Sequence, residues 1–325
     1  MTANAAAWWD EENNCFMESR KDYADPTREI AEETGCKFID ENKIVTDAWN
    51  SMSKNHVLSG YFICEPLESK AYPSGTNDTT HMKAKGAKRV AKLIADAIPE
   101  NVPELAKYLK GDETFTDIQG HWAEDVIKTL AENDKVSGVG DGKFNPDGTV
   151  TRAEFLKMAM DSLGIVGHAY RDGECLDATN DDWYCYYLQG ALDKDIIPKE
   201  MIENCNVTKV TKTLAEATDD KEAVTTDVNV YTGKFDGDKP ITREEMAAIA
   251  VRCKNYKMRR LTDWDNERRY PIFSFKDSDE IDEKYISDVV EAYNLNYIDG
   301  MEDGRFAPKE NLTRAQAAVV MNNLK

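Results

Sequence analysis

One short pattern occurs three times after residue 110. Each copy begins with Thr-Arg, at 151–152, 242–243 and 313–314, and carries Glu or Gln three residues after the Thr. This spacing is that of a capping box, in which the Thr hydroxyl and the Glu or Gln side chain each accept a hydrogen bond from the other residue's backbone amide. Apolar residues follow at intervals of three and four. The pattern predicts three helices that start alike and bury the same face.

The residues before each Thr-Arg pair repeat as well. A phenylalanine lies seven residues before the Thr in every copy, at Phe144, Phe235 and Phe306. In the first and third copies it belongs to an Asp-Gly-x-Phe-x-Pro turn, which predicts that the ring folds back onto the core. An amphipathic helix precedes each turn. A copy this short buries too little core by itself, so we expect the three to stack into one unit.

Two kinds of metal site are weighed against this pattern. The segment from Asp141 to Glu154 invites comparison with a calcium-binding EF-hand loop, but its sixth position is Pro146, where that loop requires glycine. The seven cysteines are scattered without a Cys-x-x-Cys spacing, which argues against zinc. No metal and no cofactor is predicted.

Charge and hydropathy exclude several partners. The formal net charge is -20 at pH 7, so nucleic acid is not expected to bind, and an anionic ligand must be held by local cations. No apolar run approaches the roughly 20 residues of a membrane span. The first residues lack the basic and long apolar regions of a signal peptide. We therefore expect either a cytosolic protein or a chain that begins inside a longer one.

The repeated elements together resemble S-layer homology (SLH) domains. Phe-x-Asp, His-Trp-Ala, Gly-x-x-Asp-Gly-x-Phe-x-Pro and Thr-Arg-Ala-Glu all occur in the first copy. The second copy is degenerate at its turn and carries an insertion, and the third has Tyr where Trp is usual. The resemblance implies a mainly α, pseudo-threefold domain with repeats at 111–167, 168–258 and 259–325. It also implies an extracellular location at the cell wall or S-layer of a Gram-positive-type bacterium. There the repeats would bind a secondary cell-wall polysaccharide, often pyruvylated, or another peptidoglycan-linked polymer.

The repeated arginines are the first candidates for ligand contact. A cation at the first position of a helix opposes the helix dipole, so Arg152, Arg243 and Arg314 need a reason to be there. One reason is an anion site made by the guanidinium and free helix amides. The other is an arginine that ties each copy to an acidic residue of its neighbour.

The resemblance favours ligand contact by these arginines and adds two further sets of residues to the polysaccharide site: Trp122, Trp183 and Tyr285, and Asp117, Asp177 and Asp277. From the residues alone, core packing is the default for the aromatic rings, and the aspartates could cap the helices that follow them. His121 and His168 have no partner motif and are expected to be structural or exposed.

The first 110 residues follow a different pattern. A helix is predicted over 23–33, ending at Gly35, followed by a short buried strand at 36–40 and a second helix. A long loop then places Asp78 and His81 just before another amphipathic helix. This order suits the last crossover of a doubly wound α/β sheet.

Two stretches of this segment, 31–40 and 78–91, resemble the C-terminal end of SGNH (GDSL) hydrolases of the rhamnogalacturonan and pectin acetylesterase type. They read Ala-Glu-Glu-x-Gly-x-x-x-Ile-Asp and Asp-x-Thr-His-x-x-x-x-Gly-Ala-x-x-Val-Ala. The resemblance implies a remnant of a flavodoxin-like hydrolase in which Asp78 and His81 are the catalytic pair. No Gly-Asp-Ser occurs in the chain, so the serine that the pair would activate is missing.

Three hypotheses follow. The first is a cell-wall anchor attached to a truncated esterase-like segment, and we predict no esterase activity for the chain as given. The alternative is the C-terminal part of a surface-bound carbohydrate acetylesterase, acting on plant cell-wall polysaccharide, whose nucleophile lies upstream. The third is a structural S-layer protein.

Overall fold

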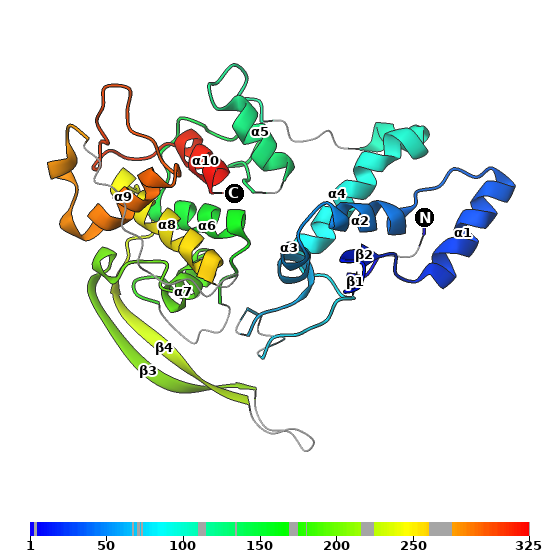
Figure 1. Ribbon diagram of the computed structural model, residues 1–325, viewed down its shortest axis with the longest axis horizontal. Coiled ribbons are helices and arrows are strands. Elements are labelled where there is room, and N and C mark those ends of the chain that lie inside the picture. Colours follow the sequence, from blue (N-terminus) through cyan, green and yellow to red (C-terminus); the bar gives the residue numbers. More distant parts are fainter. Residues whose placement is uncertain are drawn as a thin grey trace. The chain divides into compact units, whose positions relative to one another are not determined.

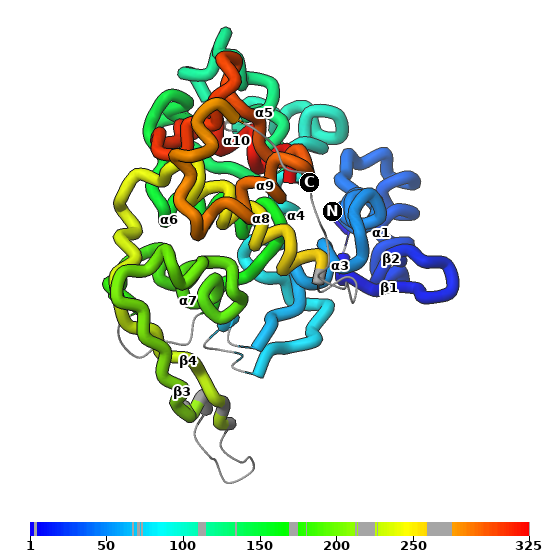
Figure 2. Tube along the Cα trace, turned by 60° about the vertical axis from the view of Figure 1, so that its left-hand side comes forward, coloured from blue at the N-terminus to red at the C-terminus, as the bar shows by residue number. Residues whose placement is uncertain are grey.

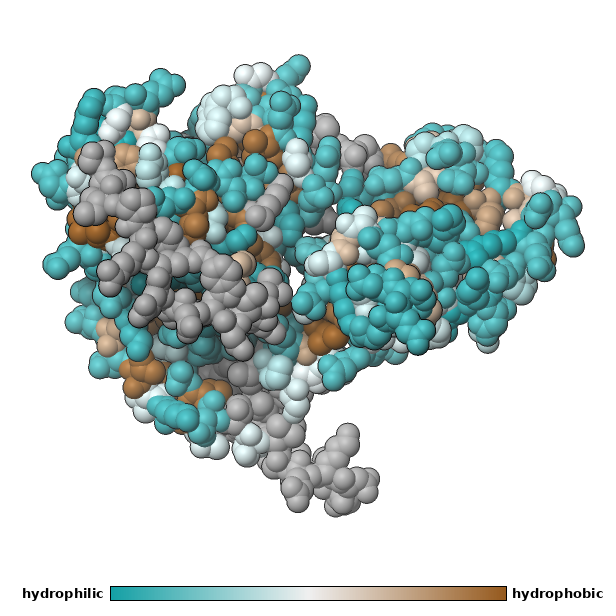
Figure 3. All heavy atoms as spheres, in the orientation of Figure 1, coloured by the Kyte–Doolittle hydropathy of each residue, from teal (hydrophilic) through white to brown (hydrophobic). Residues whose placement is uncertain are grey.

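The computed structural model describes residues 1–2, 5–66, 68–69, 72, 74–109, 115–133, 135–168, 175–179, 181–215, 224–259 and 275–324. The chain forms two compact units, Met1–Asp112 and Glu113–Lys325. Helices dominate both units, and the described strands form two small antiparallel sheets (Figure 1). Residues 260–274, in the predicted third repeat, lie outside the described residues. Hydrophilic residues cover most of the face drawn in Figure 3.

The first unit is built from short elements around an aromatic core. In chain order they are β1 (Trp8–Asp10), β2 (Cys15–Met17), α1 (Lys21–Thr34), α2 (Glu41–Asn50), α3 (Lys54–Val57), a π-helical turn (Leu58–Phe62), α4 (Ala84–Asn101) and a 3-10 turn (Pro103–Tyr108). β1 and β2 pair antiparallel. Trp49, Tyr61 and Phe62 are buried at the centre. The predicted first helix is confirmed as α1, and Gly35 ends it with a φ of +65°, a conformation that glycine adopts without strain.

The strand predicted at 36–40 does not form. The described residues here are irregular, Cys36 and Lys37 are exposed, and Ile39 is the one fully buried side chain of the five. Asp40 instead caps α2 by accepting the Lys43 amide at 3.2 Å. The described residues of this unit contain no parallel strand pair. The doubly wound sheet is therefore not confirmed.

The described residues of the second unit form three successive helix pairs. They are α5 (Glu124–Glu132) with α6 (Arg152–Leu163), α7 (Cys185–Asp193) with α8 (Arg243–Arg259), and α9 (Ile286–Asn294) with α10 (Arg314–Asn323). The described residues between these helices also form 3-10 turns, at Lys199–Met201, Ser278–Glu280 and Glu283–Tyr285. The predicted capping boxes are confirmed at all three Thr-Arg helices.

A long hairpin occupies the insertion of the second copy. β3 (Glu203–Ala215) and β4 (Val224–Lys234) pair antiparallel, with Val207 opposite Tyr231. Figure 1 and Figure 2 both show the two strands running side by side away from α7 and the helical core. The hairpin therefore adds an arm to the second copy and leaves the helix pairs in place.

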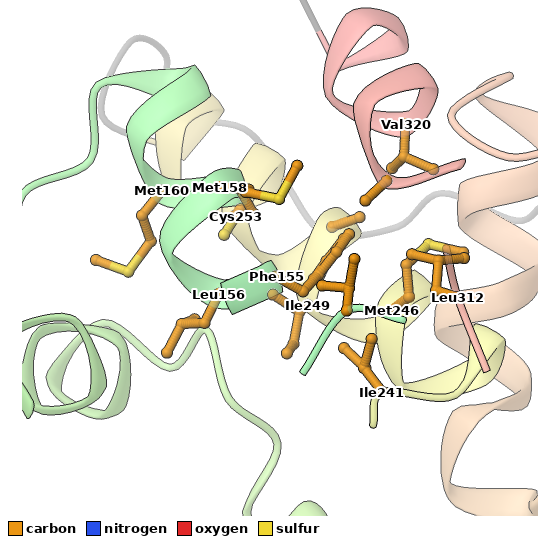
Figure 4. Close-up of a cluster of buried hydrophobic side chains, with 14 of the residues drawn as sticks. Phe155, Leu156, Met158, Met160, Ile241, Met246, Ile249, Cys253, Leu312 and Val320 are labelled. Carbon is orange, nitrogen blue, oxygen red and sulfur yellow. The ribbon is translucent and has the colours of Figure 1, made fainter. Parts of the chain in front are cut away.

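The core of this unit lies between the second helices of the three copies. Phe155 of α6, Met246 and Ile249 of α8, and Val320 of α10 belong to one cluster, drawn in Figure 4, and Phe155, Met246 and Ile249 are fully buried. The three repeated phenylalanines are also fully buried: Phe144, Phe235 and Phe306. This confirms the prediction made from the turns of the first and third copies. Burial of this kind contributes about 1.5–3 kcal/mol for each large apolar side chain.

Backbone hydrogen bonds join the three copies in a closed ring. The residue before each Thr bonds its counterpart in another copy: the Val150 amide donates to the Leu312 carbonyl (3.0 Å), Leu312 to Ile241 (3.1 Å), and Ile241 to Val150 (3.0 Å). Each bond crosses from one copy to the next, and the third returns to the first. The ring fixes the starts of α6, α8 and α10 around a common axis.

The same ring also caps the helices. The first two amides of α6, α8 and α10 donate to carbonyls in the turn of a neighbouring copy. For α6, the Arg152 amide donates to Lys239 and the Ala153 amide to Gly237, both at 2.9 Å. These are amides that an α-helix cannot satisfy internally. Since they are already bonded, they are not available to a bound anion.

Candidate functional site

Each of the three repeated arginines reaches into the next copy. Arg152 donates to the carbonyl of Phe235 at 2.6 Å and Arg243 to that of Phe306 at 2.7 Å. Arg314 closes the circle by donating from Nε to the Phe144 carbonyl at 2.8 Å. Each guanidinium also lies over the ring of the same phenylalanine.

Each arginine makes a second polar contact. Arg152 forms an ion pair with Glu245 of the second copy, through Nε at 3.1 Å and through Nη2. Arg243 donates from Nη2 to the Asp299 carbonyl (2.8 Å), and Arg314 from Nη2 to the Ser137 carbonyl (2.9 Å).

All three arginines are only 7% exposed. Burial lowers the pKa of Arg243 and of Arg314. The geometry supports the second sequence-based alternative, in which Arg152, Arg243 and Arg314 tie the copies together. It does not support the predicted anion site of guanidinium and free helix amides, because those amides are bonded.

The three aspartates hold the turns whose phenylalanine carbonyls accept hydrogen bonds from the arginines. Asp117 accepts the amides of Phe144 (2.8 Å) and Asn145 (2.7 Å). Asp177 and Asp277 accept the corresponding pairs of amides in their own copies, all at 2.8 Å. Burial acts to raise the pKa of Asp117, but the two amide bonds outweigh it and hold the pKa below its usual value. The aspartates therefore cap these turns and not the helices that follow them.

The held turn has an unusual backbone. The residue after each phenylalanine has a positive φ: +58° at Asn145, +53° at Asp236 and +58° at Ala307. Asn and Asp tolerate this left-handed region, whereas for alanine it costs about 1–2 kcal/mol. The Asp clamp and the arginine from the neighbouring copy hold the backbone in this shape.

The aromatic set divides into exposed and buried members. Trp122 is 67% exposed and Trp183 is 52% exposed, so both rings face solvent. Tyr285 is 1% exposed and is the N-cap residue of α9. Its counterparts at the N-caps of α5 and α7 are Ala123 and Tyr184. The predicted equivalence of Tyr285 with the two tryptophans is therefore wrong by one position.

The residue that matches Trp122 and Trp183 is Lys284, which is exposed. Counting back from the helix would have found it, because Ile127, Leu188 and Val289 are buried four residues after the three N-caps. The loop before the helix differs in length between copies, so counting forward from the aspartates fails.

The two histidines of this unit are held by hydrogen bonds. The Nδ1 atom of His121 accepts the Ala123 amide at 3.1 Å, and its Nε2 lies 3.3 Å from Asp147. The Nδ1 atom of His168 lies 2.7 Å from Asp193. His121 thus fixes the start of α5 directly beside Trp122.

A polar pocket opens between the second and third copies. Its volume is about 260 Å³, and six side chains line it: Lys194, Asp195, Arg252, Asn255, Tyr256 and Asp288. Arg252 and Asp288 form an ion pair at 3.2 Å across the α8–α9 boundary. Burial raises the pKa of Asp288, although Arg252 opposes the shift. The lining carries two cations and two carboxylates, so its charges balance.

The first unit places the predicted pair together. His81 Nδ1 lies 2.7 Å from Asp78 Oδ2, while Asp78 Oδ1 accepts the amides of Thr80 (2.7 Å) and His81 (2.9 Å). These bonds, led by the His81 amide, lower the pKa of Asp78 to about 2. The His81 side chain is 85% exposed. The pair has the geometry of a carboxylate that orients an imidazole.

No group of three or more His, Cys, Asp or Glu side chains among the described residues is arranged to hold a metal ion. None of the described helices combines the length and the apolar character needed to cross a membrane.

The second unit is a repeat-built module in which three helix pairs close on one another. The family description "S-layer homology domain" matches residues 114–156 and 274–318. These stretches cover parts of the first and third predicted repeats, and the second lies between them. The chain therefore carries S-layer homology domains.

Relatives of known name match large parts of this chain. An amylopullulanase of Thermoanaerobacterium thermosulfurigenes is 34% identical over 213 residues, covering 66% of this chain and 10% of that protein. The exoglucanase XynX of Acetivibrio thermocellus is 35% identical over 219 residues, covering 66% of this chain and 16% of that protein. The chain thus spans no more than about a sixth of the length of these two relatives.

A third relative concerns a different activity. Rhamnogalacturonan acetylesterase RhgT of Bacillus subtilis (strain 168) is 30% identical over 93 residues, which are 28% of this chain and 39% of that protein. The match to the acetylesterase is weaker and partial.

S-layer homology domains are modules of bacterial cell surfaces, so the chain carries a cell-surface anchoring module.

Proposed function

We propose that the second unit anchors the protein by non-covalent binding of a secondary cell-wall polysaccharide that carries pyruvyl groups, or of another polymer linked to peptidoglycan. The observation that carries this proposal is the exposure of two tryptophans at matching places, Trp122 and Trp183. A large ring left in water at the start of a helix is a surface on which a sugar ring can stack. The polar pocket between α8 and α9 offers hydrogen-bonding groups to another sugar of the polymer.

In this proposal the predicted site residues have two roles. Trp122 and Trp183 contact the polymer, while Asp117, Asp177 and Asp277 shape the turns beside them. The arginines hold neighbouring copies together, and Tyr285 packs inside the unit. The contact surface therefore depends on all three copies.

The experiment is co-sedimentation of the full chain with sacculi of Acetivibrio thermocellus, before and after acid treatment that strips the polysaccharide. Replacing both Trp122 and Trp183 by Ala should weaken binding at least about tenfold, equivalent to 1.4 kcal/mol, and should leave the melting temperature unchanged. Trp8→Ala is the matched control, since Trp8 is 44% exposed but belongs to the other unit. Equal sedimentation of stripped and unstripped sacculi would contradict the proposal.

A second candidate function rests on the Asp78–His81 pair and the partial match to an acetylesterase. We propose that the first unit is the C-terminal part of a carbohydrate acetylesterase fold whose nucleophile is absent from this chain. The chain as given then has no esterase activity, because the histidine has no serine to activate. Labelling of the purified chain by a fluorophosphonate probe, abolished by His81→Ala, would contradict this expectation.

A further inference from the structure

The contacts of β4 show which backbone groups of the hairpin face outward. The Tyr231 carbonyl accepts the Leu176 amide at 3.2 Å, and the Asn229 carbonyl accepts the Gln189 side chain at 3.4 Å. Both carbonyls therefore point away from β3. In an antiparallel pair, residues directly opposite each other point their backbone groups either toward each other or away, and the two kinds alternate along the strand. The odd-numbered residues of β4 thus face outward.

The residues opposite them on β3 face outward on the other side of the hairpin. They are Val207, Lys209, Thr211 and Thr213, which lie opposite Tyr231, Asn229, Asp227 and Thr225. In the part of the chain that the structure describes, their backbone groups make no hydrogen bond outside the hairpin. All four residues are exposed. The outer edge of β3 therefore offers N–H and C=O groups over about 20 Å, at ~3.4 Å per residue.

This edge lacks most of the features that keep sheet edges from pairing. Natural edges are protected by proline, by bulges or by a covering element, as well as by charged side chains. Residues 203–215 contain no proline. The ladder is irregular only at its two ends, between Glu203 and Asn206 and between Thr213 and Ala215. The charge of Lys209 is balanced by Asp227, which lies 3.0 Å away in the same hairpin.

Three valines lie together on one face of the hairpin. Val210 is directly opposite Val228, and Val230 lies two residues further along β4. All three are half-buried, but the core cluster of the second unit includes Tyr231, on the other face, and none of these valines. A hairpin of two strands is marginally stable in water, and a third strand stabilises it by adding backbone bonds and cross-strand side-chain pairs.

We propose that the outer edge of β3 pairs antiparallel with the same edge of a second molecule of this protein. Outward-facing residues of one molecule must meet outward-facing residues of the other. The register that uses the whole regular stretch pairs Val207 with Thr213, Lys209 with Thr211, and Val210 with its own counterpart. A four-stranded sheet results, with the two β3 strands at its centre.

The edge is complementary to itself in this register. Val210 and Val228 of both molecules form one row across the four strands, and such β-branched neighbours are favourable cross-strand pairs. Neither Lys209 nor Lys212 lies opposite a lysine, whereas a shift that placed Lys209 opposite its own counterpart would be repulsive. The two molecules are related by a twofold axis, so the interface closes at a dimer.

The first test is sedimentation velocity of the full chain. An interface this small is weak and transient, so we expect a concentration-dependent dimer with a Kd on the order of 100 µM. Thr211→Pro removes an outward N–H at a position where an edge strand tolerates proline, and should weaken dimerisation at least about tenfold. Thr211→Val is the matched control. It loses the same hydroxyl bond to Asp227 (2.8 Å) but keeps the amide, so it should dimerise as the wild type does.

Two results would overturn the pairing. One is equal association of Thr211→Pro and Thr211→Val. The other is a wild-type chain that stays monomeric up to about 1 mM, which is also what an edge reserved for a strand of a different protein would give. Thermal melting of both variants shows that the helical core is intact.

A second test reads the register and does not depend on proline. Val210→Cys places two thiols opposite each other at the twofold axis, within reach of a disulfide. Mild oxidation should therefore link the molecules through residue 210, as mapped by mass spectrometry of the joined peptides. Thr208→Cys lies on the same face but away from its own counterpart, so it should link at least about tenfold more slowly. Equal rates at the two positions would overturn the proposal. Neither test involves the cell-wall polymer, so failure here leaves the proposed function untouched.

Discussion

The ion pair between Arg152 and Glu245 should be a main support of the ring, and its loss can be calculated from the contacts. Arg152→Met keeps the apolar stem of the side chain but removes both bonds to Glu245 and the bond to the Phe235 carbonyl. Both charged side chains are 8% exposed. Removing one partner of a buried pair costs about 3–5 kcal/mol, because the other charge stays buried without compensation.

The assay is urea unfolding of the second unit followed by circular dichroism, together with thermal melting. For a unit of this size each kcal/mol lost lowers the melting temperature by about 2–4 °C, so a fall of roughly 6–20 °C is expected. Arg305→Met is the control, because Arg305 is 45% exposed and pairs with Asp303 at the surface. An exposed pair of that kind contributes about 0–1 kcal/mol.

A double-mutant cycle measures the interaction energy between Arg152 and Glu245 separately from their other contacts. Glu245→Gln keeps the capping box but removes the charge. The double replacement should cost less than the sum of the two single replacements by about 1–3 kcal/mol, because it leaves no uncompensated charge. Additive costs, or a single replacement of Arg152 within about 1 kcal/mol of wild type, would refute the assignment of this arginine to the ring.

Three further outcomes are expected. Asp277→Ala leaves the amides of Phe306 and Ala307 without an acceptor, so the free energy of unfolding should fall by about 2–4 kcal/mol in urea titrations; an unchanged value would refute the clamp. Ala307→Gly places glycine at a positive φ that is strained for alanine, so the free energy of unfolding should rise by about 0.5–1 kcal/mol and the melting temperature should rise with it; a fall would show that the turn is unstrained. Asp78 should titrate near pH 2 by carboxyl ¹³C NMR, so that the stabilisation it gives its loop is complete above its usual pKa of about 4 and is lost as the pH falls toward 2; an ordinary midpoint in the wild type, or no change in the loop amides with Asp78→Asn, would contradict it.

The parts of the fold that the sequence predicted are local ones. A capping box is set by residues three apart, so Thr151 with Glu154 could be found by inspection. The burial of Phe144 and Phe306 followed from turn chemistry in the same way. The strand at 36–40 failed because a strand needs a neighbouring chain to pair with, and a run of five residues does not say whether one is present.

The sequence identified residues of the candidate site but not the contacts that they make. The sequence singled out Arg152. Whether its partner is Glu245, 93 residues further along the chain, or a ligand depends on how the fold brings the two copies together. No local sequence pattern shows how the copies are placed. The role of Asp117 could not be predicted for the same reason, because its carboxylate accepts amides 27 and 28 residues further along the chain.

The ring of backbone bonds has a consequence for how the protein is made. The amide of Val150 finds its acceptor only in Leu312, which emerges from the ribosome 162 residues later (312 − 150). An open array of repeats adds each new copy to a finished neighbour, but a closed ring has no finished neighbour until its last copy arrives. Closing such long loops is slow, and the first two copies must wait with apolar faces exposed. The second unit should therefore complete its core only after the third copy has been synthesised.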